Sequence, residues 1–174
     1  MHFRKCISNY CLLEARKLNG ELELDESYFG GKRKGNRGRG AKNKTIVFGI
    51  LERKGKVYTV IVQDVSAETL MNEIKSKAKK GSVFYTDGWK SYARLEQYGK
   101  HNIIDHDKEL VNNHNHINGI EGFWSFAKER FHKYHGISKT NYPLYIKEME
   151  FRFNHRNENV YNLLFDICIV RRIV

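Results

Sequence analysis

Three acidic residues of this sequence, Asp25, Asp87 and Glu121, are of the types that could together support metal-dependent chemistry. Hard divalent cations such as Mg²⁺ or Mn²⁺ prefer oxygen ligands, and carboxylates supply them in many proteins. Two such ions held about 3.5–4 Å apart clamp both the attacking and the leaving oxygen of a phosphodiester. Lys128 follows Glu121 by two helical turns, so the two side chains would share one helix face. We therefore predict a phosphoryl-transfer site in which the three acids bind two ions and Lys128 contacts the substrate backbone.

Each of these residues also has an ordinary structural explanation. Asp25 lies among other acids, so an exposed strand face would account for it. Asp87 precedes Gly88, and Asp-Gly is a common turn pair. Glu121 and Lys128 could be solvated charges on a helix surface. The metal-site prediction therefore depends on the three acids converging in the fold.

The strands that would position the acids follow from hydrophobic periodicity. Strict alternation in ELELDESYF predicts a half-buried strand on which Glu23 and Asp25 share one face and Glu26 points the other way. Two apolar runs around Gly55 predict a hairpin, and SVFYTD predicts a buried strand that ends at Asp87. The predicted strands are residues 21–29, 45–51, 57–63, 82–87 and 101–105.

Helical spacing separates and follows these strands. Helices are predicted at residues 3–18, 67–79 and 88–98, from Ile117 to before Gly136, and from Pro143 to about Arg156. The helix from Ile117 contains Gly119 and Gly122, each costing about 1 kcal/mol relative to Ala, which is tolerated more readily where a helix lies close against a strand or ligand. Three antiparallel strands followed by α/β alternation predict an α/β protein with a mixed sheet flanked by helices, and with the placement of the acids this fits the ribonuclease H-like fold.

The charge of the chain points to a polyanionic partner. It has 31 Lys+Arg against 20 Asp+Glu, a net charge of +11. Solubility alone would be the simpler explanation, but seven basic residues fall within residues 32–44 and no acidic residue does. We predict that this glycine-rich loop contacts DNA phosphates through Lys32, Arg33, Lys34, Arg37, Arg39, Lys42 and Lys44.

A polar segment precedes the helix that carries Glu121. Residues 112–118 contain the letters H-N-H, but the HNH nuclease signature is spread over a larger ββα unit, so a polar loop is the better interpretation. In that loop His114 and His116 could line the site, and Asn118, one turn before Glu121, could act as a neutral oxygen ligand.

Other residues near the motifs have mainly structural interpretations. Arg152 and Arg156 follow Glu148 at intervals of four, most simply as an intrahelical salt-bridge ladder and less simply as DNA-facing groups lining the site. An odd number of cysteines without an export signal indicates reduced thiols, and the apolar runs are too short to span a bilayer, so a cytoplasmic protein is expected. Three aromatic residues are interpreted as core more readily than as base-stacking platforms: Trp89, Tyr92 and Trp124.

Four motifs in order carry a resemblance to a known family: ELELDESYFGGKRKGNRGRG, VFYTDGWKSY, NHNHINGIEGFWSFAKERFHKYHGI and YIKEMEFRFNHRN. Together they resemble the DDE transposases of small bacterial insertion sequences, in the ISXO2-like group. The resemblance implies a ribonuclease H-like core that cuts and inserts DNA with Mg²⁺ or Mn²⁺. It assigns the triad to Asp25, Asp87 and Glu121, with Lys128 as the accompanying basic residue. Because the third position varies between acidic and amide residues in that group, Asn118 remains an alternative there.

The same resemblance implies the partners and the division of the chain. The expected partners are double-stranded DNA, as terminal repeats and as target, and further copies of the chain on that DNA, within the bacterial nucleoid. We expect a residual helical segment at 1–19 in place of the DNA-binding region of other members, and a catalytic domain at 20–157. The tail at 158–174 could be a packed helix, a strand or the product of an altered reading frame. A catalytically silent DNA-binding remnant and a ribonuclease H-like nuclease remain alternatives.

Overall fold

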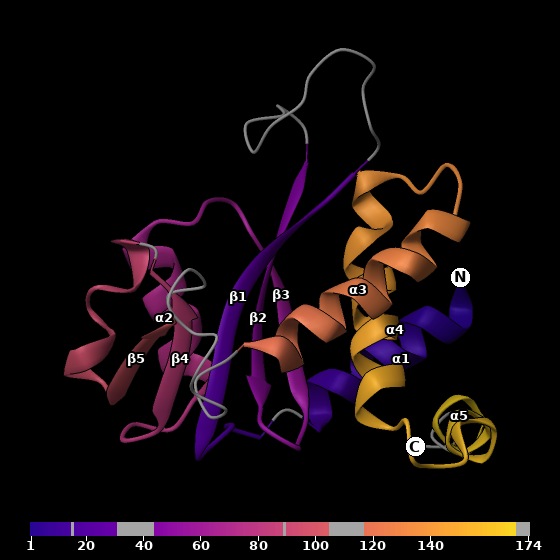
Figure 1. The fold of residues 1–174 in the computed structure, drawn as a ribbon. Coiled ribbons are helices and arrows are strands. Elements are labelled where there is room, and N and C mark those ends of the chain that lie inside the picture. Colours follow the sequence, from indigo (N-terminus) through magenta and orange to yellow (C-terminus); the bar gives the residue numbers. More distant parts are fainter. Residues whose placement is uncertain (15, 31–43, 89, 105–116, 170–174) are drawn as a thin grey trace.

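A mixed sheet forms the centre of the fold in the computed structural model, which describes residues 1–14, 16–30, 44–88, 90–104 and 117–169 (Figure 1). Within these residues β1, β2 and β3 pair antiparallel, whereas β4 pairs parallel with β1 and with β5. The order across the sheet is β3-β2-β1-β4-β5. The predicted mixed sheet is therefore confirmed. Its strands are β1 (Glu21–Phe29), β2 (Thr45–Glu52), β3 (Val57–Val62), β4 (Val83–Asp87) and β5 (Lys100–Ile104).

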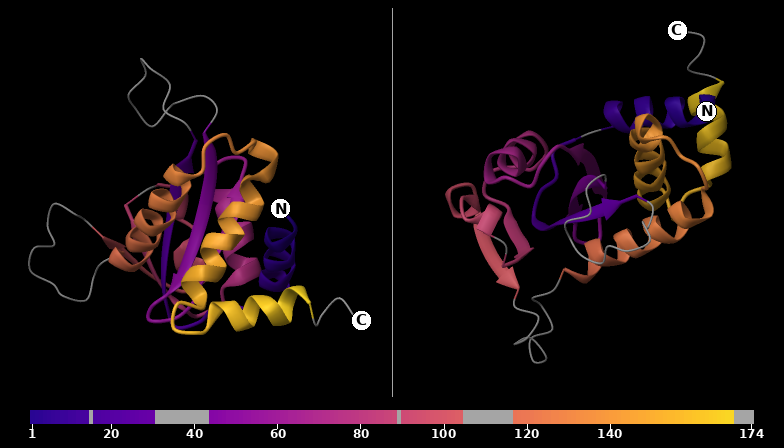
Figure 2. Two further views of the ribbon diagram at one scale, coloured as in Figure 1. Left: turned by 90° about the vertical axis from the view of Figure 1, so that its right-hand side faces the viewer. Right: turned by 90° about the horizontal axis from the view of Figure 1, so that it is seen from above.

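Helices cover both faces of this sheet. Side chains of β1 alternate between the two faces: Leu22 and Leu24 pack with the helix α2, whereas Phe29 packs with α3 and α4. Figure 2 shows α2 on one side of the sheet and α3 with α4 on the other. The described helices are α1 (His2–Leu13), α2 (Ala67–Lys77), α3 (Asn118–Lys133), α4 (Tyr142–Asn154) and α5 (Val160–Cys168).

The predicted helix at 88–98 is wrong. The chain there forms two 3₁₀ turns, Lys90–Tyr92 and Leu95–Gln97. Tertiary contacts override the helical spacing, because the buried Tyr92 donates a hydrogen bond of 2.5 Å to Glu26 on β1. Ser91 likewise donates to the carbonyl of Val65, at 2.6 Å. These contacts draw the segment after Asp87 onto the α2 side of the sheet.

The first and last helices pack together. Ile7 and Cys11 of α1 share an apolar cluster with Phe151 of α4 and with Ile167 and Cys168 of α5. Within the predicted tail at 158–174, residues 160–168 form helix α5, which packs in this cluster. Among the described helices, none is long and apolar enough to cross a membrane.

Candidate active site

Two of the predicted metal ligands, Asp25 and Asp87, lie on neighbouring parallel strands. The pairing of β1 with β4 matches Glu21 with Val83 and Glu23 with Tyr85. Continued by two residues on each strand, this register puts Asp25 level with Asp87, the last residue of β4. The charge of Asp87 contributes to raising the pKa of Asp25, so the two carboxylates interact. The structure thus brings together acids that are far apart in the sequence.

Asp25 lies in a partly apolar environment made by Trp124. Its strand partner is Gly49 on β2, and a Cβ atom at Gly49 would lie only 2.7 Å from Cζ2 of Trp124. The absence of a side chain at this position therefore lets the indole ring pack on the sheet beside Asp25. The indole N–H is buried and makes no well-formed hydrogen bond within the described part of the chain, although it is near enough to Asp25 to oppose the rise of its pKa.

This environment makes Asp25 hard to ionise. Burial raises the pKa of Asp25 to about 7, and the charges of Glu26 and Asp87 act in the same direction. The backbone N–H of Glu26, which donates to Asp25 Oδ1 at 2.8 Å, opposes the rise. Two neighbouring carboxylates repel one another, and a hard divalent cation bound by both of them would relieve this repulsion. The residues present therefore fit Mg²⁺ or Mn²⁺.

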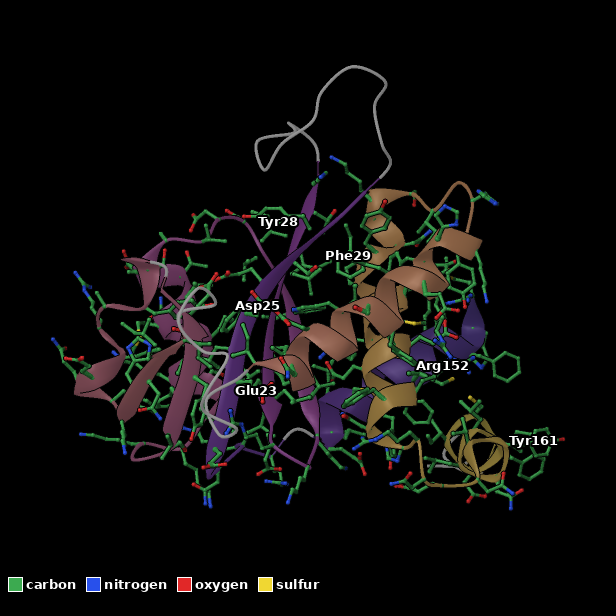
Figure 3. The ribbon with its side chains drawn as sticks, in the orientation of Figure 1. Glu23, Asp25, Tyr28, Phe29, Arg152 and Tyr161 are labelled. Carbon is green, nitrogen blue, oxygen red and sulfur yellow. The ribbon has the colours of Figure 1, made fainter. Side chains whose placement is uncertain are left out.

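Glu121 lies in the first turn of α3, which begins beside β1, and its side chain is exposed. Figure 3 shows Glu23 and Asp25 along β1, beside the first turns of α3. Lys128 is also exposed on α3, and Asn118 is exposed at its first position. Nowhere in the described ranges do three His, Cys, Asp or Glu side chains lie close enough together to hold a metal ion. The first turn of α3 thus lies against β1, but the structure does not bring the carboxylate of Glu121 together with the two aspartates.

The other predicted site residues have different placements. Arg152 pairs with Glu148 at 2.9 Å, as the salt-bridge ladder predicts, and in Figure 3 it lies on the far side of α3 from Asp25. Arg156 does not extend the ladder, because it donates to the Phe153 carbonyl and packs over that ring. Lys44 is exposed just before β2. Outside the described residues lie Trp89, His114, His116, Lys32, Arg33, Lys34, Arg37, Arg39 and Lys42.

Glu23 is a residue of this site that the sequence reasoning did not single out. It is 1% exposed and accepts hydrogen bonds from Arg53 Nε at 3.0 Å and from the backbone N–H of Ile120 at 2.9 Å. The signal was present in the alternation of β1, which placed Glu23 on the same face as Asp25. An acid on a buried face requires partners, and their identity could not be read from the neighbouring sequence.

Comparisons with known proteins identify relatives of this chain. The ISXO2-like transposase domain family matches residues 17–154. A transposase-like protein of Haemophilus influenzae is 45% identical over 103 residues, which are 59% of this chain and 84% of that protein. The catalytic core domain of BIV integrase has 12% identity and a TM-score of 0.52, covering 85% of this chain and 95% of that one. The latter likeness confirms the ribonuclease H-like fold predicted from the sequence.

Proposed function

We propose, from the premise that this chain belongs to the family of ISXO2-like transposase domains, that it cleaves and joins DNA strands at the ends of an insertion sequence with the help of divalent metal ions. The observation that carries this proposal is that Asp25 and Asp87 lie on neighbouring parallel strands, close enough for the charge of Asp87 to raise the pKa of Asp25. In this proposal Asp25, Asp87 and Glu121 hold two Mg²⁺ or Mn²⁺ ions, and Asn118 is an additional oxygen donor. Lys128 contacts the DNA backbone.

The metal ions, when bound, would neutralise charge on the scissile phosphate and on the leaving oxygen. Asp25 and Glu121 would contribute to metal binding in different ways. Asp25 is largely buried, so its ionised carboxylate gains more from a cation than an exposed one would. Glu121 is exposed on the first turn of α3, where its side chain can turn toward the aspartates.

A strand-cleavage assay tests this function directly. With Mg²⁺, the chain should nick a supercoiled plasmid that carries the element ends, and Asp87→Ala should lower this rate by about a thousandfold or more, because one metal ligand is lost. The melting temperature should stay close to that of the wild type. Asp166→Ala, a change of an exposed aspartate on α5, is the matched control and should retain activity.

The outcome also separates the alternatives. Undiminished cleavage by Asp87→Ala would contradict the metal assignment. Equal cleavage of plasmids with and without element ends would indicate a nuclease of the same fold. Binding of DNA by the wild type without cleavage in either Mg²⁺ or Mn²⁺ would indicate a catalytically silent remnant.

DNA binding by the basic segment 32–44 has its own test. Each phosphate contact that is lost should reduce the slope of log K against log salt by about 0.9. Neutralising Lys32, Arg33, Arg37 and Arg39 should therefore weaken binding and make it much less salt-dependent. A control variant that neutralises four exposed lysines should change the slope little, because they lie on α2 or before or at the starts of β4 and β5, whereas Asp87 lies at the end of β4. These are Lys75, Lys79, Lys80 and Lys100. Equal slopes for the two variants would exclude a specific role for the segment.

A further inference from the structure

The first turn of α3 lacks a local N-cap. The residue at the N-cap position is Ile117, which has no side-chain oxygen, and no side-chain hydrogen bond caps the helix there. The first backbone N–H groups of any helix have no partner inside the helix, and leaving them buried is costly. The Ile120 N–H is one of them, and its residue is fully buried. A partner must therefore come from elsewhere in the fold.

Glu23 supplies that partner from β1. Its Oε2 accepts the Ile120 N–H at 2.9 Å, across a separation of 97 residues in the chain. A carboxylate at this position also opposes the positive end of the helix dipole. Glu23 therefore caps α3 from the neighbouring strand.

Arg53 holds the carboxylate of Glu23 in place. Its Nε lies 3.0 Å from Glu23 Oε1, and its guanidinium stacks on the ring of Tyr85 with 3.6 Å between the guanidinium carbon and the ring centroid. Tyr85 in turn donates to Glu21 at 3.1 Å. Because Tyr85 lies on β4 and Arg53 directly follows β2, the carboxylate is fixed from both strands that flank β1.

Gly119 allows the helix to approach this carboxylate. A Cβ atom at Gly119 would lie 2.8 Å from Glu23 Oε2 and 2.6 Å from Leu51 Cδ2. Both distances are shorter than normal contacts of a Cβ atom, so the buried side chains of Glu23 and Leu51 would have to shift. At Gly122, one turn along the same helix, a Cβ atom would meet nothing within 4 Å. A side chain at the first glycine would therefore disturb the contact of Glu23 and Leu51 with α3, whereas one at the second would not.

We propose that Glu23, held by Arg53, is a positioning residue that fixes the first turn of α3, and hence Glu121, relative to Asp25. Glu23 precedes Asp25 by two residues on one strand face, and the amide it binds belongs to the residue before Glu121. A short, rigid path thus links two of the proposed metal ligands. This inference rests on the proposed function, because it assigns Glu121 to the metal site.

Titration of the full chain with Mn²⁺, with the heat of binding measured by calorimetry, tests the proposal without relying on activity. Glu23→Ala should weaken Mn²⁺ binding by about tenfold, the usual effect of losing a group that orients a metal ligand. In a Glu121→Gln background the same change should have almost no further effect, because Glu23 acts through Glu121. Glu23→Gln, which keeps an oxygen for the Ile120 amide, should fall between the wild type and Glu23→Ala.

The two glycines give a matched pair of variants that leave Glu23 intact. Gly119→Ala should weaken Mn²⁺ binding by about tenfold and speed hydrogen exchange of the Ile120 amide, whereas Gly122→Ala should change the affinity by less than about twofold. A helix that is only less stable would lose Mn²⁺ affinity equally with and without Glu121, and that result would overturn the proposal. So would unchanged Mn²⁺ affinity in Glu23→Ala and Gly119→Ala, or a wild type that does not bind Mn²⁺. A wild type that binds Mn²⁺ with the expected coupling but does not cleave DNA would refute only the proposed function.

Discussion

Replacing Asp25 with asparagine is expected to abolish metal-dependent DNA cleavage and to stabilise the metal-free protein above pH 7. The two effects have one cause. Burial beside Trp124 and the charges of Glu26 and Asp87 raise the pKa of the Asp25 carboxyl from an ordinary 3.8 to about 7. The ionised carboxylate is therefore unfavourable in the folded protein until a cation binds. Asparagine has similar size and no charge, so it removes the penalty and the ligand together.

The pH dependence of this stabilisation follows from proton linkage. Between pH 3.8 and about 7 the folded protein holds a proton on Asp25 that the unfolded chain has lost. The free energy of unfolding therefore falls as the pH rises through this window, by at most roughly 1.4 kcal/mol for each pH unit and on the order of 4 kcal/mol in all. The free energy of unfolding of Asp25→Asn does not fall in this way. The variant should therefore be about as stable as the wild type at pH 4 and more stable than the wild type at pH 8, by the full amount.

Urea unfolding of both proteins in EDTA at pH 4 and pH 8 measures this difference. Asp166→Asn, at an exposed position on α5, is the control and should show no pH-dependent gain. Adding Mg²⁺ at pH 8 should stabilise the wild type and leave Asp25→Asn nearly unchanged. A variant that is less stable than the wild type at pH 8, or equally stabilised at both pH values, would contradict the assigned environment of Asp25.

Replacing Glu150 with alanine is expected to lower the free energy of unfolding by about 3–5 kcal/mol, among the largest effects of any single change outside the apolar core. Glu150 is 4% exposed on α4, and its Oε2 accepts hydrogen bonds of 2.7 Å from both the backbone N–H and the hydroxyl of Thr59. The ammonium of Lys147 lies 2.7 Å from the same oxygen. Alanine would leave the Lys147 charge and two buried donors of Thr59 without this acceptor.

The position of Thr59 gives this change a second consequence. Thr59 lies on β3, which is the edge of the sheet within the described residues. Glu150 covers part of that edge, and Asn154 covers another part by exchanging hydrogen bonds of 2.7 and 2.9 Å with the backbone of Val57. An uncovered strand edge pairs readily with other chains. Glu150→Ala should therefore also increase self-association, which light scattering would detect.

A surface ion pair on another helix provides the control for Glu150. Glu129 and Lys133 pair at 3.5 Å on α3, and both side chains are largely exposed. Glu129→Ala should cost less than about 0.5 kcal/mol, because exposed ion pairs contribute little. Similar losses for Glu150→Ala and Glu129→Ala in thermal unfolding would show that the contact between α4 and β3 is not a major source of stability.

The sequence by itself determined most of the secondary structure and the face on which the acids lie. Alternation in residues 21–29 predicted that Glu23 and Asp25 share one side of β1, and the apolar run SVFYTD predicted a strand that ends at Asp87. Such patterns are local, because the period of a strand or helix is recorded in adjacent residues. The four motifs also indicated the transposase family. The helix predicted at 88–98 failed because contacts of Ser91 and Tyr92 with distant residues outweigh local spacing.

Only the tertiary structure decided how the acids are surrounded. The parallel pairing of β1 with β4 brought Asp25 near Asp87, and the glycine at position 49 admitted the ring of Trp124 beside Asp25, whose pKa is raised by burial. The cap that Glu23 provides to α3 joins residues 97 positions apart. Each of these contacts depends on the register and depth at which remote segments meet. Neighbouring residues carry no record of that geometry, so the sequence could name the acids but not the groups that hold and tune them.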